Sequence, residues 1–475
     1  MKKLDDYIIW ERPCWPGMVY YAALAVITPH VKYFGRPWCK TYGFWRRGLV
    51  CFAWPKKEFA GNALYIGRNF LKDSYFKKKI KQDQSLANKV KVTISAIDKI
   101  KFNKLSNEDF LKLVVDFYKD YLDWWGFAQV AEPAAAGLEQ ILLKNRELTQ
   151  EQISVLTAPT KESYTIEEEN ELYRQALIYR RTKKISSLWL AKHVKKYFWL
   201  NNSYANTYYL KDSFFLNRIK QIAKKYDSAE IKRFLKRNGE RLRATKKKIL
   251  SLEKELEFDQ QEKKIISRID WLADYQDKRK AFSVLLNYYT DLMIKEVSRR
   301  SKINYDLIKF ALPMEYPEIL HDRFDLSRLK ARQEHFAIIF TLKGDTLKEG
   351  QAARILKEKI LGKGVDTRIN EFEGQRAMGG KIIGKARVIL NNHQMKEMKR
   401  GEILVTTMTS PDFVPAMKKA IAIVTDEGGI TCHAAIISRE MGLPCVIGTK
   451  IATRVLKTGD KIQVNANHGL IKKLS

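Results

Sequence analysis

The chain has 475 residues, 45% of them hydrophobic and 11% aromatic, a composition that supports large buried cores and excludes a disordered chain. Lysine and arginine number 87 against 54 acidic residues, which gives a formal net charge of +33. This charge permits binding to nucleic acid, acidic lipid or phosphorylated small molecules, and a solvated basic surface explains it equally well. The length predicts about three domains.

The N-terminal region and the cysteines indicate a soluble, cytoplasmic protein. The longest apolar stretch, residues 18–29, is too short to span a bilayer and ends at Pro29. The five cysteines form no CxxC pair, and their odd number favours a reducing compartment over a disulfide framework or a zinc site. We therefore expect no membrane association.

The first two thirds of the chain predict a mainly α-helical body over residues 1–330. Residues 1–60 are rich in tryptophan and proline, and we expect them to pack irregularly, through aromatic anchors and turns. Apolar residues recur at helical spacing from about 75 to 312, and residues 243–272 predict a long charged helix or a helical hairpin. Residues 200–210 predict a loop between helices.

The pattern changes near residue 332, where strands begin to alternate with helices. We expect an α/β connector and hinge over residues 331–373, with a strand at 335–342 and a helix at 351–360. Residues 374–475 predict a compact C-terminal β/α domain. Its expected strands lie at 381–390, 402–407, 420–425, 444–448 and 461–466, and a helix is expected at 411–420.

The segment VTDEGGITCHAAIISREMGLPCVIG (424–448) contains the strongest candidate site. Gly428 and Gly429 follow a predicted strand, and His433 stands at the predicted start of a helix. A helix start presents free N–H groups and a partial positive charge, so it favours an anion. Imidazole is a nucleophile near neutral pH, which predicts that His433 carries a phosphoryl group. The alternative from chemistry alone is a structural histidine.

This segment resembles the phosphohistidine signature of the PEP-utilising enzymes, which include phosphoenolpyruvate synthase, pyruvate phosphate dikinase, rifampicin phosphotransferase and phenylphosphate synthase. The resemblance covers residues 374–475 and implies a swivelling (mobile) domain that carries phosphate on His433 between two active sites. The positions that match the family pattern are Gly428, Gly429, Thr431, His433, Ala434, Ala435, Arg439, Glu440, Gly442, Pro444 and Gly448.

The resemblance also implies roles for the residues around His433. Gly428 and Gly429 would shape the loop, and Thr431 would bind the phosphate or be a regulatory phosphorylation site. Cys432 stands where many members have serine. Arg439 could serve the phosphate or cap the helix end.

The remaining chain resembles the family only loosely, in pieces similar to the helical middle region of rifampicin phosphotransferase-like proteins. That similarity implies that the body is a substrate domain for an unknown small-molecule acceptor. No glycine-rich phosphate loop or ATP-grasp module is evident before residue 374, and no barrel follows. We therefore expect ATP and Mg²⁺ to bind a separate ATP-grasp protein, although PEP remains possible as the donor, and we expect no metal on this chain and no single-chain synthase activity.

Two further expectations concern motion and a rival function. The segment 361–376 offers Gly362, Gly364 and Gly374 as flexible points for a swivelling domain.

The alternative to a phosphotransferase is a non-catalytic regulatory or nucleic-acid-binding protein that retains the domain. Acid-labile phosphate on His433 would favour the first reading, and salt-sensitive binding of nucleic acid would favour the second.

Overall fold

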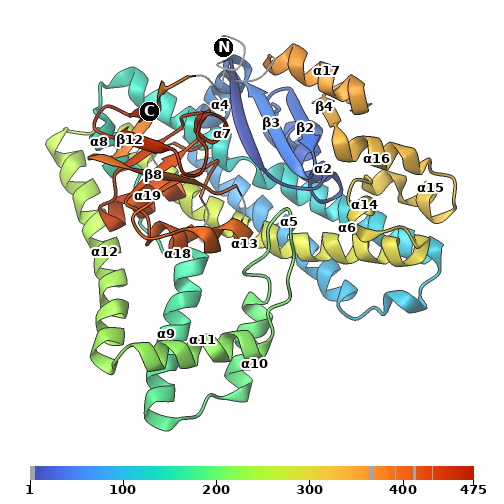
Figure 1. The fold of residues 1–475 in the computed structure, drawn as a ribbon, viewed down its shortest axis with the longest axis horizontal. Coiled ribbons are helices and arrows are strands. Elements are labelled where there is room, and N and C mark those ends of the chain that lie inside the picture. The colour runs from blue at the N-terminus through green and yellow to red at the C-terminus, as the bar shows by residue number, and fades with distance from the viewer. Residues whose placement is uncertain (1–5, 363–368, 391, 410–412, 430–431, 475) are drawn as a thin grey trace.

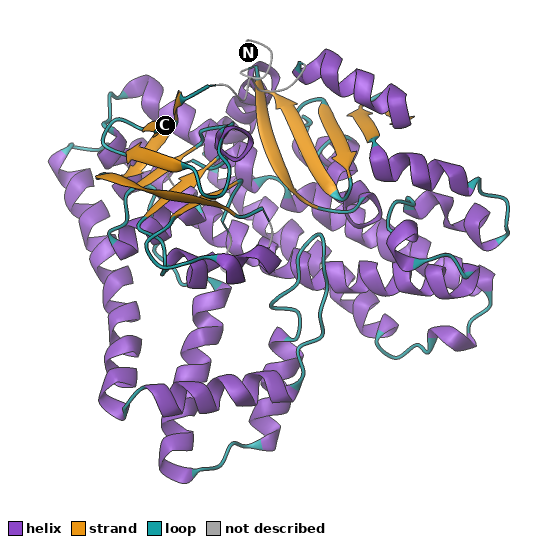
Figure 2. Ribbon diagram, viewed as in Figure 1, coloured by secondary structure: helices purple, strands orange, loops and turns teal. Residues whose placement is uncertain are grey.

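The computed structural model describes residues 6–362, 369–390, 392–409, 413–429 and 432–474. Helices make up most of the chain, and two β-sheets lie on the same side of the long helices (Figures 1 and 2). The strands of one sheet come from both ends of the body, and the other sheet belongs to the C-terminal region.

The first sheet is antiparallel, with the strand order β1-β3-β2-β4-β5. Strand β4 lies beside β2, so the segment that we expected to be a connector completes a sheet begun near the N-terminus. The strands are β1 (Tyr7–Pro13), β2 (Thr41–Arg46), β3 (Leu49–Pro55), β4 (Phe336–Thr341) and β5 (Gly344–Glu349).

The expectation of irregular packing for residues 1–60 was therefore wrong. Strands β2 and β3 are buried over most of their length, so they lack the alternation of polar and apolar residues that identifies a half-exposed strand. Pro13 and Pro55 end β1 and β3, where a missing N–H is tolerated. Helices α2 (Pro16–Ala25) and α3 (Thr28–Phe34) occupy most of the chain between β1 and β2.

The body is otherwise helical, and its largest core joins α2, α6 and the second half of α13 through aromatic side chains. The segment expected to be a long helix or a helical hairpin is divided between two helices, because α12 ends at Glu255 and α13 begins at Gln260 after a capping box formed by Asp259 and Glu262. The expected loop is confirmed at residues 201–211. The helices are α4 (Lys56–Phe70), α5 (Asp73–Ile97), α6 (Asn107–Ala128), α7 (Ala131–Asn145), α8 (Gln150–Leu156), α9 (Tyr164–Thr182), α10 (Ser187–Tyr197), α11 (Asp212–Lys225), α12 (Ser228–Glu255), α13 (Gln260–Ser301), α14 (Tyr305–Ile308), α15 (Tyr316–Leu320), α16 (Leu326–Glu334) and α17 (Gly350–Leu361).

The C-terminal sheet has the order β6-β13-β12-β8-β9-β10-β11-β7, and its centre from β8 to β11 is parallel. Every strand expected between residues 381 and 466 is present. The elements are β6 (Glu371–Glu373), β7 (Gln375–Met378), β8 (Lys381–Val388), β9 (Ile403–Thr406), α18 (Val414–Met417), β10 (Ala422–Thr425), α19 (His433–Met441), β11 (Cys445–Ile447), α20 (Ala452–Val455), β12 (Lys461–Asn465) and β13 (Leu470–Lys473).

The body and the C-terminal region have separate hydrophobic cores among the described residues. Body cores extend no further than Leu361, and the two C-terminal cores begin at Ile369. Hydrogen bonds and an ion pair join the two parts: Arg241 of α12 pairs with Glu440 of α19, and the N–H of Glu11 in β1 donates to Glu427.

The expected flexible glycines differ in their surroundings. Gly362 has a positive φ of 87° at the end of α17 and open space around it. Gly364 lies outside the described residues. Gly374 is closely packed instead, because a Cβ there would lie 2.6 Å from the carbonyl oxygen of Ile447, so its proposed role as a flexible point was wrong.

No described helix combines the length and the hydrophobicity needed to cross a membrane. The five cysteines are free thiols, and all but Cys432 are buried.

Candidate functional site

The carboxyl ends of two neighbouring parallel strands bring the site together. Thr406 at the end of β9 lies opposite Thr425 at the end of β10, so the segments that follow these strands leave the sheet side by side. One leads to Thr409, and the other leads to His433, the first residue of α19. Crevices at the carboxyl edge of parallel strands are where open α/β sheets bind ligands.

Thr409 holds the ring of His433. Its Oγ1 lies 2.9 Å from Nδ1 of the histidine, and the threonine is itself buried. Nε2 of His433 has no hydrogen-bond partner among the described residues. A threonine hydroxyl both donates and accepts, so this contact fits either tautomer of the ring. In the tautomer whose Nδ1–H donates to Thr409, Nε2 carries the free lone pair of a nucleophile.

The surroundings of His433 keep the imidazole uncharged. Burial, and after it the positive charge of Lys280 on α13, lower the pKa of His433 to about 3. The ring is therefore neutral at pH 7, and a neutral imidazole is the nucleophilic form. Lys280 belongs to the body, so His433 faces that helix across the boundary between the two parts.

The two glycines before α19 have different roles. Gly428 has φ of +114°, and a Cβ at this position would lie 2.6 Å from Sγ of Cys432. Gly429 lacks a positive φ, and a Cβ there would meet no atom of the described residues within 4 Å. The backbone therefore requires glycine at 428, and a role for Gly429 in shaping the loop stays a prediction. Thr431 lies outside the described residues.

Cys432 is the N-cap of α19, and its side chain makes no capping hydrogen bond. Burial raises the pKa of its thiol, while the amides of Ala435 and Ala434 act in the opposite direction. The thiol is therefore protonated at neutral pH and is not placed as a second nucleophile.

Replacing Cys432 with serine should preserve phosphate incorporation to within about threefold and raise the stability of the chain slightly. A serine hydroxyl caps a helix better than a thiol does, and such caps are worth about 0.5–2 kcal/mol. Thermal unfolding and phosphate incorporation on the same preparation measure both effects. A hundredfold loss of incorporation, with the fold intact, would show that the thiol takes part directly.

Arg439, in the last turn of α19, contacts the neighbouring strand β7. Its Nε donates to the carbonyl of Ala377 in β7 at 3.0 Å, and burial lowers the pKa of the guanidinium. This contact ties the last turn of α19 to the sheet. A role for Arg439 in binding phosphate stays a prediction.

Several residues that the sequence alone did not single out surround the site. Thr409 lies 24 positions before His433, and Lys280 and Arg12 belong to the body. Glu427 is buried at the boundary between the parts, and burial raises its pKa to about 8 against the opposing effect of Arg12. The sequence shows only that Glu427 directly precedes Gly428 and Gly429; it does not predict that this side chain is buried against the body.

No group of three or more His, Cys, Asp or Glu side chains is arranged to hold a metal ion in the described part of the chain.

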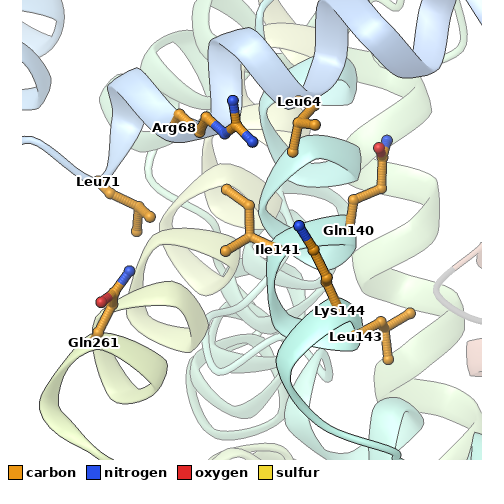
Figure 3. Close-up of a pocket in the computed structure, with 8 residues that line it drawn as sticks. All are labelled: Leu64, Arg68, Leu71, Gln140, Ile141, Leu143, Lys144 and Gln261. Carbon is orange, nitrogen blue, oxygen red and sulfur yellow. The ribbon is translucent and has the colours of Figure 1, made fainter.

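A cavity of about 740 Å³ lies between α4, α7 and the start of α13 (Figure 3). Leucine and isoleucine side chains form much of its lining, and Arg68 and Lys144 also line it. Gln261 in this cavity and Lys280 are about 28 Å apart along α13, at about 1.5 Å per residue, so the cavity is remote from His433.

Residues 398–469 match the family model described as PEP-utilising enzyme, mobile domain. The chain is 55% identical over 102 residues to phosphoenolpyruvate synthase of Pyrococcus furiosus, which is 22% of this chain and 12% of that protein. It is 54% identical over 100 residues to a probable phosphoenolpyruvate synthase of Archaeoglobus fulgidus (21% and 13%) and 52% identical over 94 residues to phosphoenolpyruvate synthase of Aquifex aeolicus (20% and 11%).

These matches concern the C-terminal domain, and they span little more than a tenth of each relative's length. Among solved structures, a chain of Thermococcus kodakaraensis aconitase X in its holo-form aligns with 22% of this chain and 98% of its own length at 24% identity. Its TM-score of 0.18 is too low to support an inference.

Proposed function

We propose that this chain is a phosphotransferase component in which Nε2 of His433 accepts a phosphoryl group and passes it to an acceptor bound against the helical body. The observation that carries the proposal is the arrangement of His433 itself. Its ring is neutral, Thr409 holds Nδ1, and Nε2 is unpartnered among the described residues, within a domain that matches the PEP-utilising mobile domain.

The proposed transfer has two steps that leave the carrier unchanged. In the first, the lone pair of Nε2 attacks the phosphorus of the donor, and the bond to the donor's oxygen breaks with its electron pair on that oxygen. In the second, an acceptor oxygen attacks the same phosphorus, the bond to Nε2 breaks, and Nε2 recovers its lone pair while the acceptor's proton leaves to water. The N–H groups at the start of α19 and its dipole stabilise the phosphoryl charge between the steps.

Movement of the C-terminal domain would connect two sites. Its polar boundary with the body and its separate core support a carrier that docks and leaves as a unit. We assign ATP and Mg²⁺ to a separate ATP-grasp protein, where magnesium would neutralise the phosphate charges during transfer. The acceptor is a small molecule that meets His433 on the face of the body near Lys280.

The test is to incubate the chain with β- and γ-labelled ATP or labelled PEP, with and without a candidate ATP-grasp partner. We expect label that is stable in alkali, is lost in acid and maps to the peptide containing His433. Acid-stable label, or label on another residue, would overturn the proposal. Binding of nucleic acid that weakens with salt, without any labelling, would favour the regulatory alternative.

A further inference from the structure

Helix α12 carries a dense set of lysine and arginine side chains on its outer side. The helix has 28 residues, of which Ile231, Ile249 and Glu253 are buried, and it runs along one edge of the molecule (Figure 1). It spreads its exposed cations over about 24 Å, at about 1.5 Å per residue. They stay exposed while Arg241 of the same helix pairs with Glu440 of the C-terminal domain. The eight exposed cations are Lys232, Arg233, Lys236, Arg237, Arg243, Lys246, Lys247 and Lys248.

Acidic side chains do not neutralise this face. Lys236 forms an ion pair with Glu240 at 3.5 Å, and the other seven cations form no ion pair with a described residue. Lys232, Arg233 and Arg243 each have another cation four residues further along the helix, where like charges repel. The helix is therefore destabilised by its own charge, and a polyanion bound along it would relieve that repulsion.

The helices around α12 share this charge. Residues 164–255, which contain α9 to α12, include 23 basic and 10 acidic residues. Two of the acidic residues are used inside this part of the body, because Glu168 pairs with Arg218 and Glu171 pairs with Lys196. The excess of positive charge is left on the outside, with α12 as its longest exposed row.

The cations cover more than half of the circumference of α12. Successive residues are about 100° apart around a helix, which places the eight side chains within an arc of about 200°. The remaining arc faces the body, where Phe234 packs on one hydrophobic core and Ile249 belongs to another.

This distribution does not suit a membrane. A flat bilayer surface contacts one side of a helix, and helices that lie in it insert an apolar face. On α12, all of whose residues the structure describes, Leu250 is the one large hydrophobic side chain exposed to solvent. A ligand with negative charge on both flanks of the helix fits better.

We propose that the outer face of α12 binds nucleic acid through its phosphate backbone. Each strand of duplex DNA carries a phosphate about every 3.4 Å along its axis, so the basic face of α12 spans about seven phosphates. The major groove of DNA admits an α-helix between two rows of phosphates, which matches cations on both flanks. This function is additional to the proposed phosphotransfer and does not require phosphate on His433.

The test measures binding of the full, unphosphorylated chain to a fluorescent DNA duplex of about 24 base pairs, at several salt concentrations. We expect a Kd of about 10⁻⁴–10⁻⁶ M at physiological salt, with the logarithm of the binding constant falling linearly as the logarithm of salt rises. The triple variant Arg233→Gln, Arg237→Gln and Lys247→Gln should weaken binding about tenfold or more. Its salt slope should be shallower by about 2.7, because each lost phosphate contact removes about 0.9. Glutamine retains the helix propensity of the residues that it replaces.

The matched control is the triple variant Lys77→Gln, Lys78→Gln and Lys81→Gln. It removes three exposed cations from α5 and changes the net charge by the same amount. We expect this variant to bind DNA with the wild-type affinity and salt slope. Equal losses in the two triple variants, with both chains folded by circular dichroism, would assign binding to the whole basic surface and overturn the inference. Absence of binding by the wild-type chain would overturn it as well.

Two other polyanions distinguish nucleic acid from other classes of partner. Vesicles rich in phosphatidylserine and polyglutamate should each bind the wild-type chain at least about tenfold more weakly than DNA does, because neither has two rows of phosphates around a groove. Binding of either probe as tightly as DNA, with loss in the α12 variant, would assign the face to a membrane or to an acidic protein instead. Labelling of His433 is a separate measurement on the same chains, so failure of this inference is distinguished from failure of the proposed function.

Discussion

The His433→Ala variant will incorporate no acid-labile phosphate from any donor system that labels the wild-type chain. Among the described residues of the site, Nε2 of His433 is the nucleophile that alanine removes, since Nδ1 is occupied by Thr409 and the thiol of Cys432 is held in its protonated form. The loss should be complete to the background of the assay. It is measured as label that survives alkali and disappears in acid, counted per mole of folded chain.

His468→Ala provides the matched control, since His468 is an exposed histidine of the same domain. This variant should take up phosphate at the wild-type level, which separates loss of the carrier from general damage to the domain. Because His433 lies on the first turn of α19 and contributes little to the cores, both variants should unfold at nearly the wild-type temperature. Label remaining on His433→Ala would show that another residue is the carrier.

Gly428→Ala should reduce phosphate incorporation about a hundredfold or more, which corresponds to a barrier increase of about 2.7 kcal/mol. The backbone at this position has φ of +114°, which an alanine rarely adopts, and the added Cβ would lie 2.6 Å from Sγ of Cys432. Relief of that clash has to move either the loop or the N-cap of α19, and both displace His433. Initial rates of labelling at matched protein concentration measure the effect.

Gly429→Ala serves as the adjacent control. Its backbone has no positive φ, and a Cβ would meet no atom of the described residues within 4 Å, so its labelling rate should stay within about threefold of wild type. If the two alanine variants lose activity equally, the loop is sensitive to any side chain and the conformational argument for Gly428 is wrong. Equal retention would show that the loop before α19 does not position the nucleophile.

The C-terminal domain was largely predictable because its local patterns agree with its fold. Strands β9 and β10 are short runs of buried apolar residues, each followed by polar residues, and the glycine pair marks the turn into α19. Short-range signals of this kind predicted the position of His433 at a helix start. They did not predict Thr409, because that contact depends on the two parallel strands lying side by side.

The N-terminal sheet was not predictable from local patterns. Gly43 and Phe44 in β2 pair with Ile338 and Ala337 in β4, and nothing near either segment indicates so distant a partner. Buried strands rich in aromatic residues also resemble an irregular aromatic cluster when the sequence is considered alone. The same limit applies to Lys280, whose charge acts on His433 only where the body and the C-terminal region lie together.

The pairing of β2 with β4 has a consequence for the order in which the protein is made. About 290 residues separate the two strands, so at about 5–20 residues per second the ribosome takes about 15 to 60 s to supply the second after the first. Such a distant contact is slow to form, and β1 to β3 stay an incomplete sheet during this interval. The C-terminal region follows β4 in the chain, so β1, the strand that bears Arg12, is able to join a finished sheet before that region is supplied. Synthesis thus supplies the docking surface before the domain that docks on it.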